Sequence, residues 1–137
     1  MNPAVSVVIP IYNEIENLDE LVARLETALA GLDFEALLVD DGSKDGTGVR
    51  LAELAATRPW LKPIYLAKNY GQSTAMQAGF DAARGEVIVT LDGDLQNDPA
   101  DIPRLLKMLE EDPEVDILSG WRKARQDAAI KRKLPSR

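Results

Sequence analysis

An α/β fold built on one mostly parallel sheet is predicted by three observations. Short apolar runs that suit buried strands alternate with longer segments whose leucines recur at helical spacing. Such alternation is typical of right-handed βαβ units. The apolar runs also end at acidic or glycine-containing turns, as strands do where they leave the core of an open sheet. The chain of 137 residues has the size of a single compact domain.

The first half of the chain predicts three strands and two helices. In order, these are a strand over residues 5–10, a helix over 17–32, a strand over 35–39, a helix over 47–58 and a strand over 62–67. Asn17 and Thr47 are predicted to cap the two helices. Pro63 lies inside the third strand, which indicates an edge position in the sheet.

The second half continues the same alternation. It predicts a helix over 72–84, a strand over 87–91, a helix over 102–111 and a strand over 115–119. The first of these helices is rich in alanine and glycine, so we expect it to lie close on the sheet, with Gly85 ending it. Pro103 suits the first turn of the next helix.

The composition restricts the chemistry that the chain can perform. It contains no cysteine and no histidine, which excludes disulfides, thiolate metal sites and a histidine general base. Any metal must therefore be held by oxygen ligands, which favours Mg²⁺ or Mn²⁺. No signal peptide is visible, and no apolar run approaches the ~20 residues of a membrane-spanning helix.

The net charge of −7 is unevenly distributed. Residues 122–137 carry seven basic side chains and one acidic side chain, whereas residues 1–121 are strongly acidic. We therefore divide the chain into a body, 1–121, and a basic C-terminal segment, 122–137. This segment is either a solvated end or a phosphate-binding or membrane-facing element. Nucleic acid is a poor partner for so acidic a body.

An acidic group of side chains is predicted at one edge of the sheet. If the strand order is 3-2-1-4, the ends of strands one, two and four converge there. The residues collected are Tyr12, Glu14, Asp40, Asp41, Asp92 and Asp94. Alone, Asp92-Gly93-Asp94 is either an acidic turn or a metal site. The group suits a nucleoside diphosphate bound through Mg²⁺ or Mn²⁺, and the phosphate-binding loop of kinases and the glycine fingerprint of dehydrogenases are absent.

Three motifs carry a family resemblance: VSVVIPIYNE over residues 5–14, VDDGSKDGT over 39–47 and LDGDLQNDP over 91–99. Together they resemble the GT-A glycosyltransferases of family 2, especially the branch that uses polyprenyl phosphates, such as dolichyl-phosphate mannose synthases and bactoprenol glucosyltransferases. The resemblance implies a Rossmann-like three-layer fold. It covers nearly the whole chain, although family members continue beyond this length, so the chain resembles a truncated catalytic domain.

The resemblance also implies roles for individual residues. Nucleotide binding falls to Pro10, Tyr12, Glu14, Asp40, Asp41 and Asp92; catalysis to Asp92 and Asp94; metal binding to Asp92, Asp94 and Gln96; and phosphate or acceptor binding to Arg122, Arg132, Ser136 and, more weakly, Arg125. Gly93 would keep a small group beside the diphosphate.

The implied activity is transfer of a hexose from UDP- or GDP-hexose to a polyprenyl phosphate, with inversion expected from the family. An acceptor phosphate is already an anion and needs no general base, which agrees with the lack of histidine. The alternatives are a family 2 enzyme acting on a saccharide hydroxyl, a nucleotide-sugar-binding fragment without turnover, and a flavodoxin-like or receiver-type domain. For the full-length protein we expect the cytoplasmic face of the membrane and a role in the cell envelope; the fragment itself we expect to be soluble.

Overall fold

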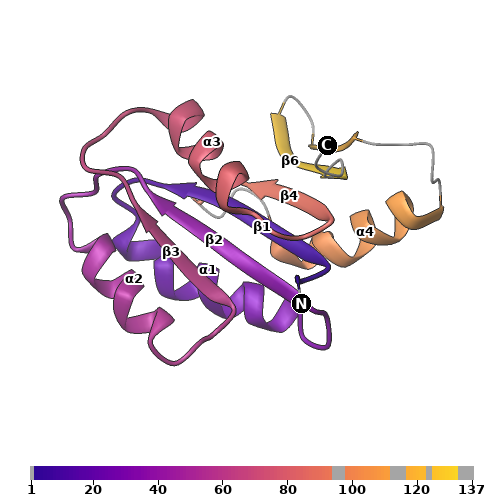
Figure 1. Ribbon diagram of the computed structural model, residues 1–137, viewed down its shortest axis with the longest axis horizontal. Coiled ribbons are helices and arrows are strands. Elements are labelled where there is room, and N and C mark those ends of the chain that lie inside the picture. Colours follow the sequence, from indigo (N-terminus) through magenta and orange to yellow (C-terminus); the bar gives the residue numbers. More distant parts are fainter. Residues whose placement is uncertain (1, 94–97, 112–116, 123–124, 133–137) are drawn as a thin grey trace.

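The computed structural model describes residues 2–93, 98–111, 117–122 and 125–132. Its sheet has the strand order β3-β2-β1-β4-β6-β5 (Figure 1). The strands are β1 Val5–Ile11, β2 Phe34–Asp40, β3 Leu61–Tyr65, β4 Val87–Leu91, β5 Ile117–Arg122 and β6 Arg125–Arg132. The first four are parallel and have the predicted order, with β3 at the edge. The α/β class with a mostly parallel sheet is thereby confirmed.

Helices cover both faces of the sheet, which makes the fold three-layered (Figure 1). The helices are α1 Ile15–Ala28, α2 Thr47–Ala55, α3 Gln72–Ala82, the 3₁₀ helix η1 Pro99–Asp101 and α4 Ile102–Glu111. Leucines and isoleucine of α1, α2 and α4 share one hydrophobic cluster with β1 and β2, so these three helices form one layer. Helix α3 forms the other layer.

The two faces of β1 bury different partners because successive side chains of a strand point to opposite sides. Val7 and Ile9 face the large cluster with Leu21 and Leu25 of α1. Val8 faces the smaller cluster that includes Met76 of α3. An unbroken apolar strand is what a sheet covered on both sides requires.

Helix α3 lies close on the sheet, as its small residues predict. Ala75 is fully buried, and a Cβ placed on Gly79 would lie 2.3 Å from Cγ1 of Val8. A larger side chain at Gly79 would therefore push the helix away from β1. This close packing positions the amino-terminal end of α3 beside the ends of the parallel strands.

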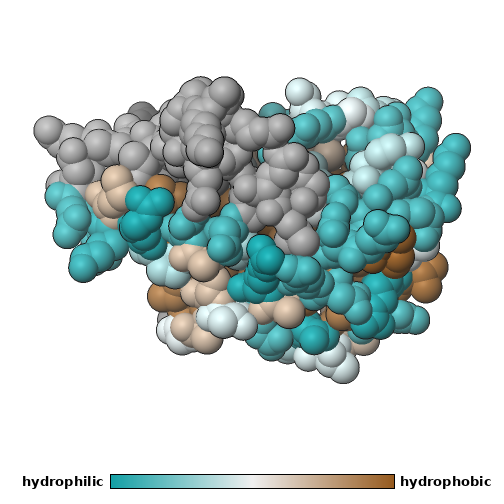
Figure 2. Space-filling model, turned by 180° about the vertical axis from the view of Figure 1, so that it is seen from behind, coloured by the Kyte–Doolittle hydropathy of each residue, from teal (hydrophilic) through white to brown (hydrophobic). Residues whose placement is uncertain are grey.

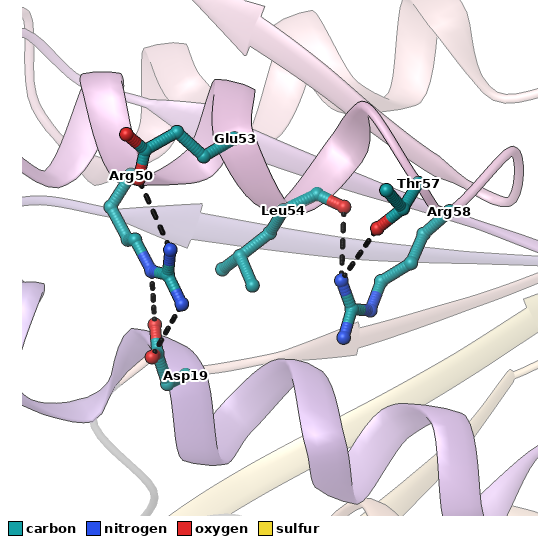
Figure 3. A network of polar contacts seen from close by, with 6 residues as sticks. All are labelled: Asp19, Arg50, Glu53, Leu54, Thr57 and Arg58. Atoms are coloured by element: carbon teal, nitrogen blue, oxygen red, sulfur yellow. Dashed lines mark hydrogen bonds and ion pairs between the residues drawn. The ribbon is translucent and has the colours of Figure 1, made fainter.

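Ion pairs on the surface join α1 to α2 (Figure 3). The guanidinium of Arg50 donates to both carboxylate oxygens of Asp19, at 2.8 and 2.9 Å, and also to Glu53. At the other end of α2, Arg58 donates to the carbonyl of Leu54. The contacts of Arg50 are exposed, so they contribute little to stability.

A buried polar cluster closes the edge of the sheet where the parallel strands begin. The Ser6 hydroxyl donates to Glu35 at 2.6 Å and accepts from the Gly85 N–H at 2.7 Å. The same Glu35 oxygen accepts from the Arg84 N–H at 2.8 Å. The cluster therefore ties the segment after α3 to β1 and β2. The prediction that Gly85 ends the helix is wrong, because α3 ends at Ala82 and its C-cap is Ala83.

Several details differ from the elements expected from the sequence. Asn17 does not cap the first helix but lies inside α1, whose N-cap position is Glu14. Thr47 begins α2 but makes no capping bond; the N-cap position is Gly46, with a left-handed backbone. Residues 125–132, expected as part of a basic tail, form β6, which pairs antiparallel with both β4 and β5. The sheet therefore extends past the boundary at residue 121 that the charge distribution suggested.

The coloured part of the face seen in Figure 2 is largely polar. In the coloured part of the face seen in Figure 2, hydrophobic residues form small separate areas rather than one continuous patch. Among the described residues, no helix is both long and apolar enough to cross a bilayer.

Candidate functional site

The carboxyl ends of β1, β2 and β4 meet at one edge of the sheet. Ile11 pairs with Asp40, and the Asp41 N–H donates to the Ile11 carbonyl at 2.9 Å, so β1 and β2 stay joined to their last residues. On the other side of β1, Val8 pairs with Thr90, which brings Gly93 beside Ile11. This convergence is what the strand order predicts.

The loops that follow β1 and β2 are joined by hydrogen bonds. Side chains of each loop satisfy backbone N–H groups of the other. The bonds run from the Asn13 N–H to the Ser43 hydroxyl at 2.8 Å, from the Lys44 N–H to the Asn13 side-chain oxygen at 2.9 Å, from the Glu14 N–H to the Thr47 hydroxyl at 3.0 Å and from the Ile15 N–H to Asp45 at 3.2 Å. The two loops therefore form one structural unit at the site.

Asp40 and Asp41 are both buried, with 5% and 4% of their surfaces exposed, but they face different elements. Asp40 accepts from the Ser43 N–H at 3.0 Å, and its other oxygen lies against Gly48 in α2. Asp41 faces the loop between β3 and α3. Consecutive residues of an extended chain point to opposite sides, so the two carboxylates do not line one pocket together.

Asp40 influences a neighbouring tyrosine at the end of β3. Burial raises the pKa of the Tyr65 hydroxyl, and the nearby Asp40 charge raises it further. The neutral hydroxyl donates to the Gly48 carbonyl at 3.1 Å. Asp40 is thus held between the loop after β2, α2 and Tyr65.

The Asp41 carboxylate is occupied by three N–H donors. One oxygen accepts from the Tyr70 N–H at 2.8 Å, and the other accepts from the Gly71 N–H and the Asn69 amide, both at 2.9 Å. The Asn69 amide also donates to the Asp41 carbonyl at 3.1 Å. In this structure, Asp41 organises the loop before α3.

Asp92 and Gly93 follow β4 at the same edge. The side-chain amide of Gln72, the first residue of α3, donates to Asp92 at 3.2 Å. A Cβ on Gly93 would lie 2.6 Å from Cγ2 of Ile11 and 3.1 Å from the Pro10 carbonyl. The need for a small residue at Gly93 therefore arises from β1, in addition to any ligand that binds there.

Asp92, which follows β4, is partly exposed. Its carboxylate is the kind of oxygen ligand that a hard divalent cation prefers. The other two predicted metal ligands, Asp94 and Gln96, lie outside the described residues. Within the described part, no group of three acidic side chains is close enough to hold a metal ion. Asp40 and Asp41 therefore do not complete a metal site with Asp92.

The remaining predicted nucleotide residues lie at the end of β1. Pro10 is buried in the strand, whereas Tyr12 is 44% exposed at the start of the following loop. Glu14 is half-buried, and its carboxylate accepts from the Asn17 amide at 3.2 Å. Across the edge, Tyr70 is also exposed, with the Lys68 ammonium 5.4 Å from its ring centre. Two exposed tyrosines thus flank the ends of β1 and β2.

The pairing of β5 and β6 places the predicted basic residues at different edges. Arg122 pairs with Arg125 at the end of the hairpin, beyond the pairs that Ala128 makes with Gly120 and Leu91, so both arginines lie on the Asp92 side. Arg132 pairs with Val87 at the opposite edge, about 16 Å from Asp92 along the strand. Ser136 and the side chains of these arginines lie outside what the structure describes.

Sequence reasoning did not single out Gln72, Asn69 or Ser43, although each contacts a predicted site residue. Ser43 and Asn69 lie in turn-rich segments, where their residue types are common for local reasons. Gln72 contacts a residue twenty positions away, and no local pattern encodes such a contact. The strand order was the one available signal, because it brings the start of α3 to this edge.

Curated proteins resemble this chain in sequence. The chain is 46% identical over 134 residues to a dodecaprenyl-phosphate galacturonate synthase of Rhizobium johnstonii, covering 96% of this chain and 39% of that protein. It is 47% identical over 132 residues to an undecaprenyl-phosphate 4-deoxy-4-formamido-L-arabinose transferase of Pseudomonas syringae, covering 93% of this chain and 38% of that protein. The chain thus spans about two fifths of the length of these curated relatives.

Solved structures show the same fold. A mannosyltransferase, PcManGT from Pyrobaculum calidifontis in complex with GDP-Man and Mn²⁺, superposes with a TM-score of 0.82 at 22% identity, over 96% of this chain and 45% of that chain. TarS 1–349 of S. aureus in complex with UDP-GlcNAc gives a TM-score of 0.68 at 23% identity, over 99% and 37%. The model of the family described as glycosyl transferase family 2 matches residues 6–136. This match over nearly the whole chain shows that the chain belongs to glycosyl transferase family 2.

Proposed function

We propose that this chain is the donor-binding part of a glycosyltransferase that moves a sugar from a nucleotide-sugar to a polyprenyl phosphate. The observation that carries the proposal is the convergence of Tyr12, the joined loops after β1 and β2, and Asp92 at one edge of the sheet. Exposed aromatic side chains suit a nucleobase, and a carboxylate at the strand end suits a ribose hydroxyl or a divalent cation. The names of the relatives support the lipid-phosphate acceptor.

The proposed roles follow from these positions. Tyr12 stacks on the base, and Asp40 and Glu14 support the loops that form the pocket. Asp92, with Asp94 and Gln96, holds Mg²⁺ or Mn²⁺, which when bound stabilises the negative charge that develops on the leaving diphosphate. The acceptor phosphate attacks as an anion, so the chain needs no general base at this step.

The basic segment is proposed to face the acceptor. The hairpin end formed by Arg122 and Arg125 is on the Asp92 side of the sheet, which suits a role in binding a phosphate. The register gives less support to Arg132, because it pairs at the far edge. For the full-length protein we propose a position at the cytoplasmic face of the membrane, where a polyprenyl phosphate is accessible.

Calorimetric titration tests donor binding directly. The chain is titrated with UDP and with GDP, each with and without Mn²⁺, and the same series is run on Asp94→Ala. We expect one nucleotide to bind in a metal-dependent manner, and the gain in affinity from Mn²⁺ to fall more than about tenfold in the variant. Asp98→Asn is the matched control, because Asp98 lies in the same loop but accepts from the Ala100 N–H.

The acceptor is tested separately with a donor that binds. Transfer to an undecaprenyl phosphate in detergent supports the proposal, whereas transfer only to a saccharide hydroxyl would assign the chain to a different branch of the family. Donor binding without either product would identify a nucleotide-sugar-binding fragment. A folded chain that binds neither nucleotide would refute the donor site itself.

A further inference from the structure

A chain of contacts links the end of β2 to the end of β4 through the loop before α3. It begins at the buried Asp41 carboxylate, whose three N–H donors all come from residues 69–71. Hydrogen bonds to a buried carboxylate are charge-assisted and are stronger than neutral ones. Asp41 therefore fixes the backbone of this loop at Tyr70 and Gly71 and holds the side chain of Asn69.

The glycine after Asp41 allows the loop to lie this close. A Cβ on Gly42 would lie 2.5 Å from the Asn69 nitrogen and 2.5 Å from the Lys68 carbonyl carbon. Gly42 also has a φ of +74°, which L side chains rarely adopt. The backbone of the loop thus rests directly on the backbone that follows β2.

The loop ends where α3 begins, at Gln72. Because Gly71 is held by Asp41, the position from which the Gln72 side chain extends is fixed as well. Its amide reaches Asp92 and donates to one carboxylate oxygen at 3.2 Å. A hydrogen bond of this kind orients a carboxylate and thereby favours its binding to a metal ion.

We propose that Asp41 and Gln72 are positioning residues for Asp92: Asp41 holds residues 69–71, and this loop places the Gln72 amide on the Asp92 carboxylate. The inference rests on the proposed function, because the role of Asp92 in binding the donor or its metal is part of that proposal. It assigns Asp41 a different task from contact with the base, because both of its oxygens are already engaged by the protein.

The link between Asp41 and Gln72 is tested by NMR on the chain without ligand. The side-chain NH₂ signals of Gln72 are assigned by their loss in Gln72→Ala. In Asp41→Asn we expect these signals to move toward the position of a free glutamine, and the Tyr70 and Gly71 amides to exchange at least about tenfold faster. Unchanged Gln72 signals in a folded Asp41→Asn would overturn the proposal.

Gln77 supplies an internal reference and a control. It lies on the same helix, and its amide donates to the Asp81 carboxylate at 2.9 Å, away from the site. Its signals should stay in place in Asp41→Asn. If Asp41→Asn does not fold, Asn69→Ala replaces it, because this change removes one donor to Asp41 and leaves the Tyr70 and Gly71 N–H groups in place. A smaller shift of the Gln72 signals in the same direction is expected, and its absence would overturn the proposal.

The effect on the site is measured as the ratio of nucleotide affinities with and without Mn²⁺. Gln72→Ala should lower this ratio by up to about tenfold, and Gln77→Ala should leave it unchanged. The double variant of Asp41 and Gln72 should lose no more than Asp41→Asn alone, because both act through one contact. An unchanged ratio in Gln72→Ala, or additive losses, would contradict the proposed positioning.

The two proposals can fail separately. If the unaltered chain binds no nucleotide, the proposed function is refuted, and the NMR comparison alone decides whether Asp41 positions Gln72. If nucleotide binds with Mn²⁺ but the ratio is insensitive to Gln72, donor binding stands and the positioning role is refuted.

Discussion

Replacing Gly42 by alanine should destabilise the chain far more than the same change at Gly46. Both glycines have a positive φ, +74° and +94°, so alanine costs about 1–2 kcal/mol in backbone conformation at each. At Gly46 nothing lies within 4 Å of the added Cβ, and this cost stands alone. At Gly42 the methyl group meets the backbone of Lys68 and Asn69 at 2.5 Å, and such overpacking adds about 1–3 kcal/mol.

Urea denaturation of the two variants, measured side by side, gives the difference. We expect a loss of about 1–2 kcal/mol for Gly46→Ala and of about 2–5 kcal/mol for Gly42→Ala. Amide exchange at Tyr70 should also accelerate in Gly42→Ala, because the displaced loop can no longer reach Asp41. Equal losses in the two variants would show that the loop does not rest on Gly42, and the reasoning on close approach would be wrong.

Two other predictions concern stability. Ser6→Ala removes the hydroxyl donor to buried Glu35, so urea unfolding should show a loss of stability of about 1–3 kcal/mol. Ser73→Ala, at an exposed position of α3, should show almost no loss. Equal effects of the two changes would contradict this prediction. Desolvation acts to raise the pKa of Asp45, but hydrogen bonds from the Thr47 hydroxyl and from the backbone N–H groups of Ile15, Thr47 and Asp45 lower it overall. A carboxyl whose pKa is lower in the folded chain stabilises the fold at pH values above its unfolded pKa of about 3.9, and this stabilisation is lost as the pH falls through the folded pKa. The difference in free energy of unfolding between the unaltered chain and Asp45→Asn should therefore shrink from pH 5 to pH 3. A difference that grows toward acid would refute the assignment.

The parallel part of the fold was predictable because each element has a strong local pattern. Continuous apolar runs identified β1, β2 and β4, and the small residues of α3 predicted its close packing on Val8. Strand β6 was not predicted. Its sequence, RQDAAIKR, has neither an apolar run nor a clear alternation, and its pairing with β4 on one side and β5 on the other is a tertiary contact without a local signal.

The acidic group was predictable as a set of positions but not as a set of contacts. Strand order sufficed to bring Asp40, Asp41 and Asp92 to one edge. The direction in which each carboxylate points depends on where its strand ends. Sequence patterns locate the end of a strand only to within a few residues. For this reason the engagement of Asp41 with residues 69–71, and the contact of Gln72 with Asp92, became visible only in the structure.

The position of β6 between β4 and β5 affects the order in which the chain can fold as it is synthesised. When β4 leaves the ribosome, its neighbour on one side, β1, has already been made, but the partner for its other side is encoded some forty residues later. Until then one edge of the apolar strand β4 has no backbone partner, and such an edge is prone to pair with another molecule. Strands β5 and β6 are close in sequence and can form a hairpin first. Docking of this hairpin onto β4 is therefore the step that protects the nascent domain from aggregation.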